Sequence, residues 1–180
     1  MIARARFCLS CGRRLRTVDG EGRRRRRCPA CGWTFYGNAV PAAAGIVVRG
    51  DRVLLTRRAH PPYAGRWDLP GGFLDGAESP EAGVRRELKE ELGIEVRELK
   101  VLGFLMDRYG PGGLPILNVV FRVIPEPGPI RPADDVSEAR WFPVDAVPFR
   151  AIGFPAMRQA VRDYARRRAE RARRRGAPAP

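Results

Sequence analysis

Lysine and histidine are almost missing from this sequence, although the chain is strongly basic. Only Lys89 and Lys100 are lysines among 34 basic residues, and the formal net charge is +14. The codon bias of a GC-rich genome would produce this excess of arginine, and the many glycines and prolines fit the same bias. We favour that explanation. A basic surface that attracts nucleotides or RNA stays open as the alternative.

The one histidine, His60, precedes two prolines in a stretch with loop composition. We therefore interpret it as a surface or substrate-edge residue rather than as a general base. Long apolar runs are also missing, because no segment approaches the roughly 20 residues of a membrane span. Residues 1–7 are too short for a secretory signal. We expect a cytoplasmic protein without a membrane partner, where structural disulfides are uncommon.

The four cysteines form two C-x2-C pairs that are separated by sixteen residues, namely Cys8 with Cys11 and Cys28 with Cys31. Two residues between thiolates allow the backbone to fold around one tetrahedral ion, and the gap suits a zinc-ribbon hairpin. Four thiolates complete the zinc shell, so this site predicts a structural role. Two disulfides or a rubredoxin-like iron site are the alternatives.

The N-terminal segment and the rest of the chain differ in composition. All cysteines lie before a boundary that we place at residues 37–41, and a regular hydrophobic pattern follows it. We expect a zinc ribbon over residues 1–37, with Arg23 to Arg27 on its second strand as a solvated edge or, alternatively, an RNA contact. A second domain is expected over residues 38–168, and a frayed, arginine-rich tail over residues 169–180.

One stretch, residues 72–94, organises the second domain. Ser79 is a good N-cap, Pro80 suits the first helical position, and Gly93 is a ready left-handed stop. These signals predict a helix from Pro80 to Leu92.

This helix would carry an apolar stripe and, beside it, a crowded acidic face. Like charges at three- and four-residue spacing repel, and Arg86 should offset only Glu90. Carboxylate oxygens are the ligands that Mg²⁺ or Mn²⁺ prefers, so we expect a metal site on this face. The acidic face consists of Glu87, Glu90 and Glu91.

The remaining pattern predicts strands, two long loops and a closing helix. The helix should begin near Pro155 and pack its first half on the sheet. The loops are expected at residues 107–115 and 125–137. Strands are expected at residues 42–48, 53–57, 94–105, 116–124 and 138–142.

The spacing in residues 72–94 fits the Nudix box, G-x5-E-x7-R-E-U-x-E-E-x-G-U with U aliphatic, at every fixed position. The chain therefore resembles a Nudix hydrolase. Together with the cysteine pairs it is similar to the zinc-ribbon Nudix enzymes, a group that includes NADH pyrophosphatases and enzymes that cleave ADP-ribose or FAD. The resemblance implies an α+β fold, with a Nudix α/β/α sandwich around a mixed β-sheet and a small N-terminal zinc ribbon.

The resemblance also implies roles for the box residues. Glu87 and Glu91 would be the chief metal ligands, and Glu90 would be a ligand or a water activator. Arg86 would orient these glutamates, with Glu78 as an outer supporting acid. The backbone carbonyl of Gly71 would complete the magnesium site.

Outside the box, the chain offers four further candidates. By resemblance, Asp135 and Glu138 would reach the metals or act as base, and we assign Glu138 to the catalytic set and Asp135 to the substrate set. Trp67 and Tyr109 are candidate nucleotide contacts, with core packing as the alternative for both.

The expected activity is Mg²⁺- or Mn²⁺-dependent cleavage of the pyrophosphate in a nucleoside diphosphate linked to another moiety, such as ADP-ribose, FAD or NADH. Residues 103–111 do not carry the S-Q-P-W-P-F-P array of the NADH branch, which disfavours NADH. Removal of nucleotide caps from RNA, hydrolysis of nucleoside triphosphates and a non-catalytic ligand sensor are the alternatives. A homodimer stays open.

Overall fold

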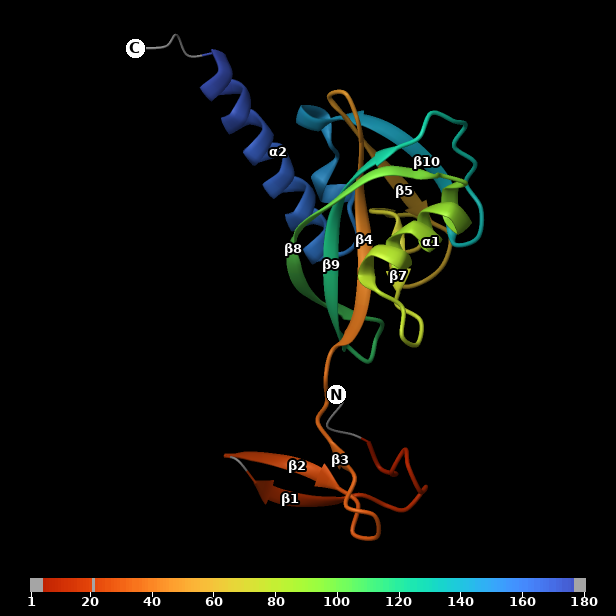
Figure 1. Cartoon of the computed structure of the whole chain (residues 1–180), viewed down its shortest axis with the longest axis vertical. Helices are drawn as coiled ribbons and strands as arrows, with labels where there is room; N and C mark the ends of the chain where they lie inside the picture. Colours follow the sequence, from red (N-terminus) through yellow and green to blue (C-terminus); the bar gives the residue numbers. More distant parts are fainter. Residues whose placement is uncertain (1–4, 21, 177–180) are drawn as a thin grey trace.

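A computed structural model describes residues 5–20 and 22–176 of the chain. Figure 1 displays a small three-stranded sheet near the N-terminus and a larger domain with a twisted sheet and two long helices. Residues 36–39 have no regular structure and join the two parts.

The small sheet is antiparallel, in the order β1-β2-β3. Its strands are β1 (Arg16–Gly20), β2 (Arg23–Arg27) and β3 (Thr34–Phe35). The run of five arginines therefore forms the second strand, as predicted. The buried core here is very small and consists of Cys8, Leu15 and Cys28.

The larger sheet is mixed, because β4 runs parallel to β9 whereas its other pairings are antiparallel. The order is β10-β5-β4-β9-β8, with β6 paired to β5 and β7 paired to β4. The strands are β4 (Val40–Arg49), β5 (Arg52–Arg58), β6 (Trp67–Asp68), β7 (Gly71–Phe73), β8 (Val96–Tyr109), β9 (Leu114–Pro125) and β10 (Val136–Pro143).

Helices α1 (Pro80–Leu92) and α2 (Pro155–Gly176) cover opposite faces of this sheet (Figure 1). On one face Val84, Leu88 and Leu92 are fully buried against strands β4, β5 and β9. On the other face, Met157 and Val161 belong to a second buried cluster. Two short 3-10 turns, Val144–Ala146 and Phe149–Ala151, precede α2. The expected α/β/α sandwich is confirmed.

Helix α1 begins and ends where its capping residues predict. The Ser79 hydroxyl accepts a hydrogen bond from the Ala82 amide at 3.1 Å. Gly93 has a φ of 68°, and its amide donates to the carbonyls of Leu88 and Lys89. A left-handed stop of this kind favours glycine, because glycine has no Cβ to clash.

One expectation about an irregular segment is corrected. The loop predicted at residues 107–115 is shorter, because Tyr109 pairs with Leu114 and extends the β8–β9 hairpin to a turn at residues 110–113. In the arginine-rich segment from residue 169, where a tail was predicted, helix α2 continues through Gly176, and alanine, arginine and glutamate are good helix formers. Residues 177–180, also part of that prediction, lie outside the described residues.

Candidate active site

The acidic face of α1 opens into a cavity of about 320 Å³. This cavity brings together residues that are more than sixty positions apart in the sequence. Its charged and aromatic lining comprises Arg58, Asp68, Phe73, Asp75, Arg86, Glu87, Glu90, Glu91, Asp107, Tyr109, Asp134, Asp135 and Phe154. Seven of the residues that the sequence predicted as site residues thus share one cavity: Gly71, Arg86, Glu87, Glu90, Glu91, Tyr109 and Asp135.

Glu91 lies deepest among the three helix glutamates, with only 6% of its surface exposed. Its Oε2 accepts a hydrogen bond from the Gly71 amide at 3.0 Å. Burial raises the pKa of Glu91 to about 9. A buried carboxyl with so little compensation is stabilised when a cation lies beside it.

Gly71 occupies a position that requires glycine. Its φ is 140°, and a Cβ at this residue would lie 2.2 Å from the Ala43 carbonyl oxygen. The strand β7 backbone therefore passes very close to β4. This close approach allows the Gly71 amide to reach Glu91.

Arg86 holds more of the acidic face than the sequence predicted. Its guanidinium donates to Glu78 at 3.0 Å, to Glu87 at 2.9 Å and to Glu90 at 2.9 Å. A further hydrogen bond goes to the Phe73 carbonyl at 3.0 Å. The expectation that Arg86 offsets only Glu90 was wrong, because helix spacing alone does not account for the loop that brings Glu78 back to this guanidinium.

These contacts set the charge states on the face. Hydrogen bonds from Arg86 lower the pKa of Glu78, and those same bonds raise the pKa of Arg86 itself. Burial raises the pKa of Glu87, and Arg86 acts against that effect. Glu91, which Arg86 does not contact, is left as the least compensated carboxyl of the three.

The opposite wall contains an ion pair that the sequence analysis missed. Asp68 is 5% exposed, and its Oδ2 lies 3.3 Å from Nη1 of Arg58. Burial raises the pKa of Asp68 to about 6, while Arg58 acts in the opposite direction. One signal in the sequence could have revealed this ion pair. Asp68 is a charged residue between the apolar Trp67 and Leu69, just before the Nudix box.

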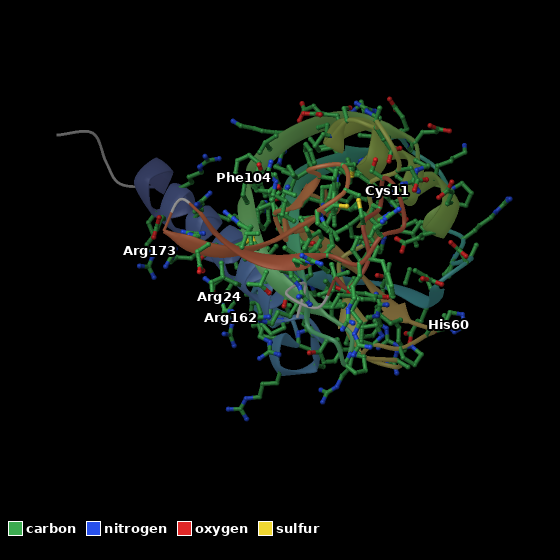
Figure 2. All side chains as sticks on the ribbon, turned by 90° about the horizontal axis from the view of Figure 1, so that it is seen from below. Cys11, Arg24, His60, Phe104, Arg162 and Arg173 are labelled. Atoms are coloured by element: carbon green, nitrogen blue, oxygen red, sulfur yellow. The ribbon has the colours of Figure 1, made fainter. Side chains whose placement is uncertain are left out.

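An aromatic wall closes another side of the cavity. The Tyr109 ring stacks on Phe154 at a centroid distance of 5.9 Å and meets the edge of Phe73 at 5.2 Å. Asp135 lines the mouth of the cavity together with Asp134. Its carboxylate lies 4.0 Å from the exposed His60, and Figure 2 places His60 at the periphery of the molecule, as predicted.

Trp67 and Glu138 do not line the cavity. For Trp67 the structure shows core packing, which was the alternative interpretation. The Trp67 ring is 6% exposed and packs at an edge angle on Phe142, with the guanidinium groups of Arg57 and Arg140 also over it. This packing leaves no free face for a base. The Glu138 carboxylate pairs with the same two arginines, at 2.9 Å and 2.6 Å. Glu138 is therefore directed to β5 rather than to the cavity.

The four cysteines form a compact cluster in the small sheet. Their sulfur atoms all lie within 4.8 Å of one another, and the Cys8–Cys31 and Cys11–Cys28 pairs are 3.6 Å and 3.5 Å apart. Figure 2 displays these sulfur atoms gathered around Cys11. A tetrahedral site with metal–sulfur bonds of about 2.3 Å separates its sulfurs by about 3.8 Å. The cluster could therefore hold one metal ion.

Histidine, cysteine, aspartate and glutamate side chains can all bind a metal ion. Among the described residues, this cysteine cluster is the one group of at least three such side chains whose ligand atoms lie close together. The glutamates of α1 line the cavity, but their carboxylate oxygens are not gathered in this way. Arg86 holds two of them, Glu87 and Glu90. None of the helices in residues 5–20 and 22–176 is long and apolar enough to span a membrane.

Comparisons with known proteins agree with this geometry. The NUDIX domain family model matches residues 39–164. The chain is 35% identical over 159 residues to the NAD-capped RNA hydrolase NudC of Pseudomonas aeruginosa, covering 87% of this chain and 53% of that protein. It is 30% identical over 136 residues to an ADP-ribose pyrophosphatase of Methanocaldococcus jannaschii, covering 74% and 78%.

A solved structure is similar over almost the whole chain. The NUDIX hydrolase from Nitrosomonas europaea superposes with a TM-score of 0.74 at 27% identity and covers 97% of this chain and 95% of that one. By contrast, the chain spans about half the length of the NudC relatives that it matches. The match to the domain model, the sandwich fold and the box residues around one cavity establish that this protein belongs to the Nudix family.

Proposed function

We propose that this protein is a pyrophosphohydrolase that cleaves the pyrophosphate of a nucleoside diphosphate linked to another moiety, such as ADP-ribose, FAD or NADH. The observation that carries this proposal is the shared cavity. It joins the glutamates of the Nudix box to Tyr109 and Asp135, the predicted nucleotide contacts. The similarity to an ADP-ribose pyrophosphatase supports the same substrate class.

The donor set of the cavity fits Mg²⁺ or Mn²⁺. Glu87, Glu90 and Glu91 supply carboxylate oxygens, which are the preferred ligands of these hard cations, and Gly71 would add its carbonyl. Burial raises the pKa of Glu91, and the nearby Glu87 and Asp68 act in the same direction, so a cation bound beside Glu91 would stabilise its charged form. When bound, such a cation neutralises charge that develops on the diphosphate and activates water for attack.

The protein's own residues position these groups. The Gly71 amide fixes one oxygen of Glu91 and leaves the other for a ligand. Arg86 orients Glu87 and Glu90, and Glu78 in turn holds Arg86. The Tyr109 wall offers an apolar surface to a base or to the second moiety of the substrate.

We also propose that residues 1–37 are a zinc ribbon and residues 38–168 the hydrolase domain. The sulfur separations of the cysteine cluster support Zn²⁺, because they approach those of a tetrahedral thiolate shell. Four cysteines leave no open position for a substrate. The ribbon would therefore stabilise or recognise rather than catalyse.

Replacing the proposed ligands tests the assignment. Glu91→Gln and Glu90→Gln should each lower turnover by about 10²-fold or more, because each removes one negative charge from the metal site. The Glu91→Gln variant should remain folded, since a glutamine oxygen still accepts from the Gly71 amide. Turnover with saturating Mg²⁺ and thermal unfolding would be measured side by side.

The matched control is Glu81→Gln, which changes an exposed glutamate of the same helix that does not line the cavity. This variant should retain its turnover within about twofold. Near-normal rates for Glu90→Gln and Glu91→Gln would refute the ligand assignment.

A panel of substrates tests the substrate class. ADP-ribose, FAD, NADH, diadenosine polyphosphates and nucleoside triphosphates would be assayed with Mg²⁺ and with Mn²⁺. We expect cleavage of at least one dinucleotide-type substrate into two monophosphates. Cleavage of triphosphates alone would overturn the proposal, and tight binding without turnover would favour a ligand sensor.

Removal of NAD-type caps from RNA is the second candidate, because the chain is similar to NudC, a protein described as an NAD-capped RNA hydrolase. A capped RNA and the free dinucleotide would be compared over a range of salt concentrations. A capped RNA that is the better substrate at low salt only, with a steep loss as salt rises, would favour this function.

A further inference from the structure

Two neighbouring cavities lie on the sheet face that α2 covers, away from α1. They measure about 500 Å³ and 520 Å³ and lie side by side, because both are lined by Arg122, Tyr164 and Arg168. We call the two together the α2 groove. Arg49 also lines the first cavity, but its guanidinium lies over the Trp141 ring. The other basic residues of the groove are Arg97, Lys100, Arg122, Arg167, Arg168 and Arg171.

The sheet strands bring positive charges together in this groove. Lys100 on β8 and Arg122 on β9 are direct cross-strand partners. Like charges in such positions destabilise a sheet. Glu98 contacts Arg122 at 3.1 Å and is, among the side chains that the structure describes, the one ion-pair partner of these six basic residues. Most of the positive charge in the groove is thus uncompensated.

Helix α2 adds its own arginines to the same side. At 100° per residue, Tyr164, Arg167, Arg168 and Arg171 fall within an arc of roughly 100°. At the same spacing, Asp163 and Glu170 fall outside this arc. Asp163 pairs with Arg166 at 3.0 Å. Folding therefore assembles a basic face from three separate segments, which arginine-rich composition alone does not require.

The shape of the depression indicates the class of ligand. A single anion would need only two or three of these basic groups, whereas two adjacent cavities with basic residues along both match a row of phosphates. The half-buried ring of Tyr164 lies where the cavities meet and offers a surface for base stacking. We propose that the α2 groove binds a single-stranded nucleic acid through its phosphodiester backbone.

The position of the groove relates it to the candidate active site. Met157, in the first turn of α2, lines the active-site cavity, and Arg168 lies eleven residues further along the helix. At 1.5 Å per residue this separation is about 17 Å. Binding in the groove does not, however, depend on the proposed hydrolase activity.

The test uses a short, uncapped single-stranded RNA with a 5′-hydroxyl, in buffer without divalent cations. Such an RNA contains no pyrophosphate, so its binding is measured apart from any hydrolysis. Fluorescence anisotropy would be recorded over a range of salt concentrations. The groove variant is Arg167→Gln, Arg168→Gln and Arg171→Gln combined.

The matched control removes the same number of charges from the other side of the helix. It combines Arg162→Gln, Arg166→Gln and Arg173→Gln, all exposed residues; Arg162 and Arg173 are labelled along α2 in Figure 2. Thermal unfolding would confirm that both variants fold. Because the two variants have the same net charge, any difference between them is specific to the groove.

We expect the groove variant to bind at least tenfold more weakly than the control at low salt. Its plot of log affinity against log salt should be shallower by about 2, since each lost phosphate contact on a single strand removes about 0.7 from the slope. Tyr164→Leu should weaken binding with little change of slope, because it removes a stacking surface and no charge. An equal loss in both arginine variants would overturn the proposal in favour of diffuse attraction.

Two further arms identify the ligand. A single-stranded DNA of the same sequence distinguishes recognition of phosphates from recognition of the RNA 2′-hydroxyl, and binding of either strand with loss in the groove variant supports the proposal. Vesicles of phosphatidylserine and phosphatidylcholine provide the competing ligand. Groove-dependent binding to vesicles with no binding to either oligonucleotide would overturn it.

Discussion

The two candidate metal sites of this protein differ in how far they are assembled before a metal binds. In the small sheet, the four cysteine sulfurs already lie within 4.8 Å of one another. On α1, Arg86 holds Glu87 and Glu90 with hydrogen bonds, while Glu91 is anchored separately on Gly71. A site whose ligands already converge suits a permanent structural ion. A site whose carboxylates are held by an arginine side chain suits an ion that binds together with the substrate.

The two parts also differ in the core that supports each site. The buried cluster of the small sheet consists of Cys8, Leu15 and Cys28, so two of its three members are proposed metal ligands. The larger domain buries two clusters, one on each face of its sheet. The ribbon should therefore depend on its metal for folding, whereas the domain should depend on its metal for chemistry alone. The following experiments address that difference.

Removal of zinc should have the largest effect. Structural zinc in such sites contributes about 10–16 kcal/mol of binding free energy that is coupled to folding. Treatment with a strong chelator should therefore unfold β1–β3 and leave the larger domain folded. Hydrogen–deuterium exchange would reveal loss of protection in residues 16–35 only, and elemental analysis of the untreated protein should give about one zinc per chain. Protection that persists in the metal-free ribbon would contradict the comparison.

Shortening a core side chain in the larger domain should have an intermediate effect. Leu88 is fully buried between α1 and the sheet, so Leu88→Ala should lower the free energy of unfolding by about 2–5 kcal/mol. Urea unfolding would measure the loss. Zinc content should stay unchanged, because the ribbon has its own cluster.

The reciprocal variant is Leu15→Ala in the ribbon, where Leu15 is 3% exposed. It should weaken zinc retention in a competition with chelator and leave the urea midpoint of the larger domain unchanged. If Leu15→Ala shifts that midpoint as much as Leu88→Ala does, the two parts are one folding unit.

The smallest effect is expected at the start of α1. Ser79→Ala removes the hydroxyl that accepts from the Ala82 amide, which should cost about 1 kcal/mol of unfolding free energy. Ser79→Asn restores a good N-cap and should recover most of this loss. Because the glutamates proposed as metal ligands lie in the last two turns of the helix, turnover should change little in either variant.

Local signals in the sequence predicted the helix that carries the site. Its bounds, Pro80 and Leu92, follow from a serine N-cap and a glycine stop, and both caps form their predicted hydrogen bonds. The strands β4 and β5 were predicted from two apolar runs that lie close together in the sequence, and the structure pairs these runs across a short turn. In both cases the determining interactions join residues that are close in the sequence.

Predictions failed where distant strands decide the outcome. The β8–β9 hairpin extends through Tyr109 because cross-strand pairing with Leu114 outweighs a glycine- and proline-rich composition. Trp67 and Glu138 are both candidate site residues in the sequence. In the structure, the Trp67 ring and the Glu138 carboxylate both contact the guanidinium of Arg57. The Asp68–Arg58 pair went unnoticed, because its importance depends on burial that neither residue indicates alone.

The sequence by itself determined the reaction class and the two sets of proposed metal ligands, because box spacing and cysteine spacing are local properties of the chain. Only the tertiary structure decided which of the predicted residues meet. It placed Tyr109 and Asp135 in one cavity with the glutamates and packed Trp67 and Glu138 outside that cavity. It also gave Arg86 three carboxylate partners instead of one. The physical reason is that burial and charge compensation arise from packing between elements that the sequence places far apart.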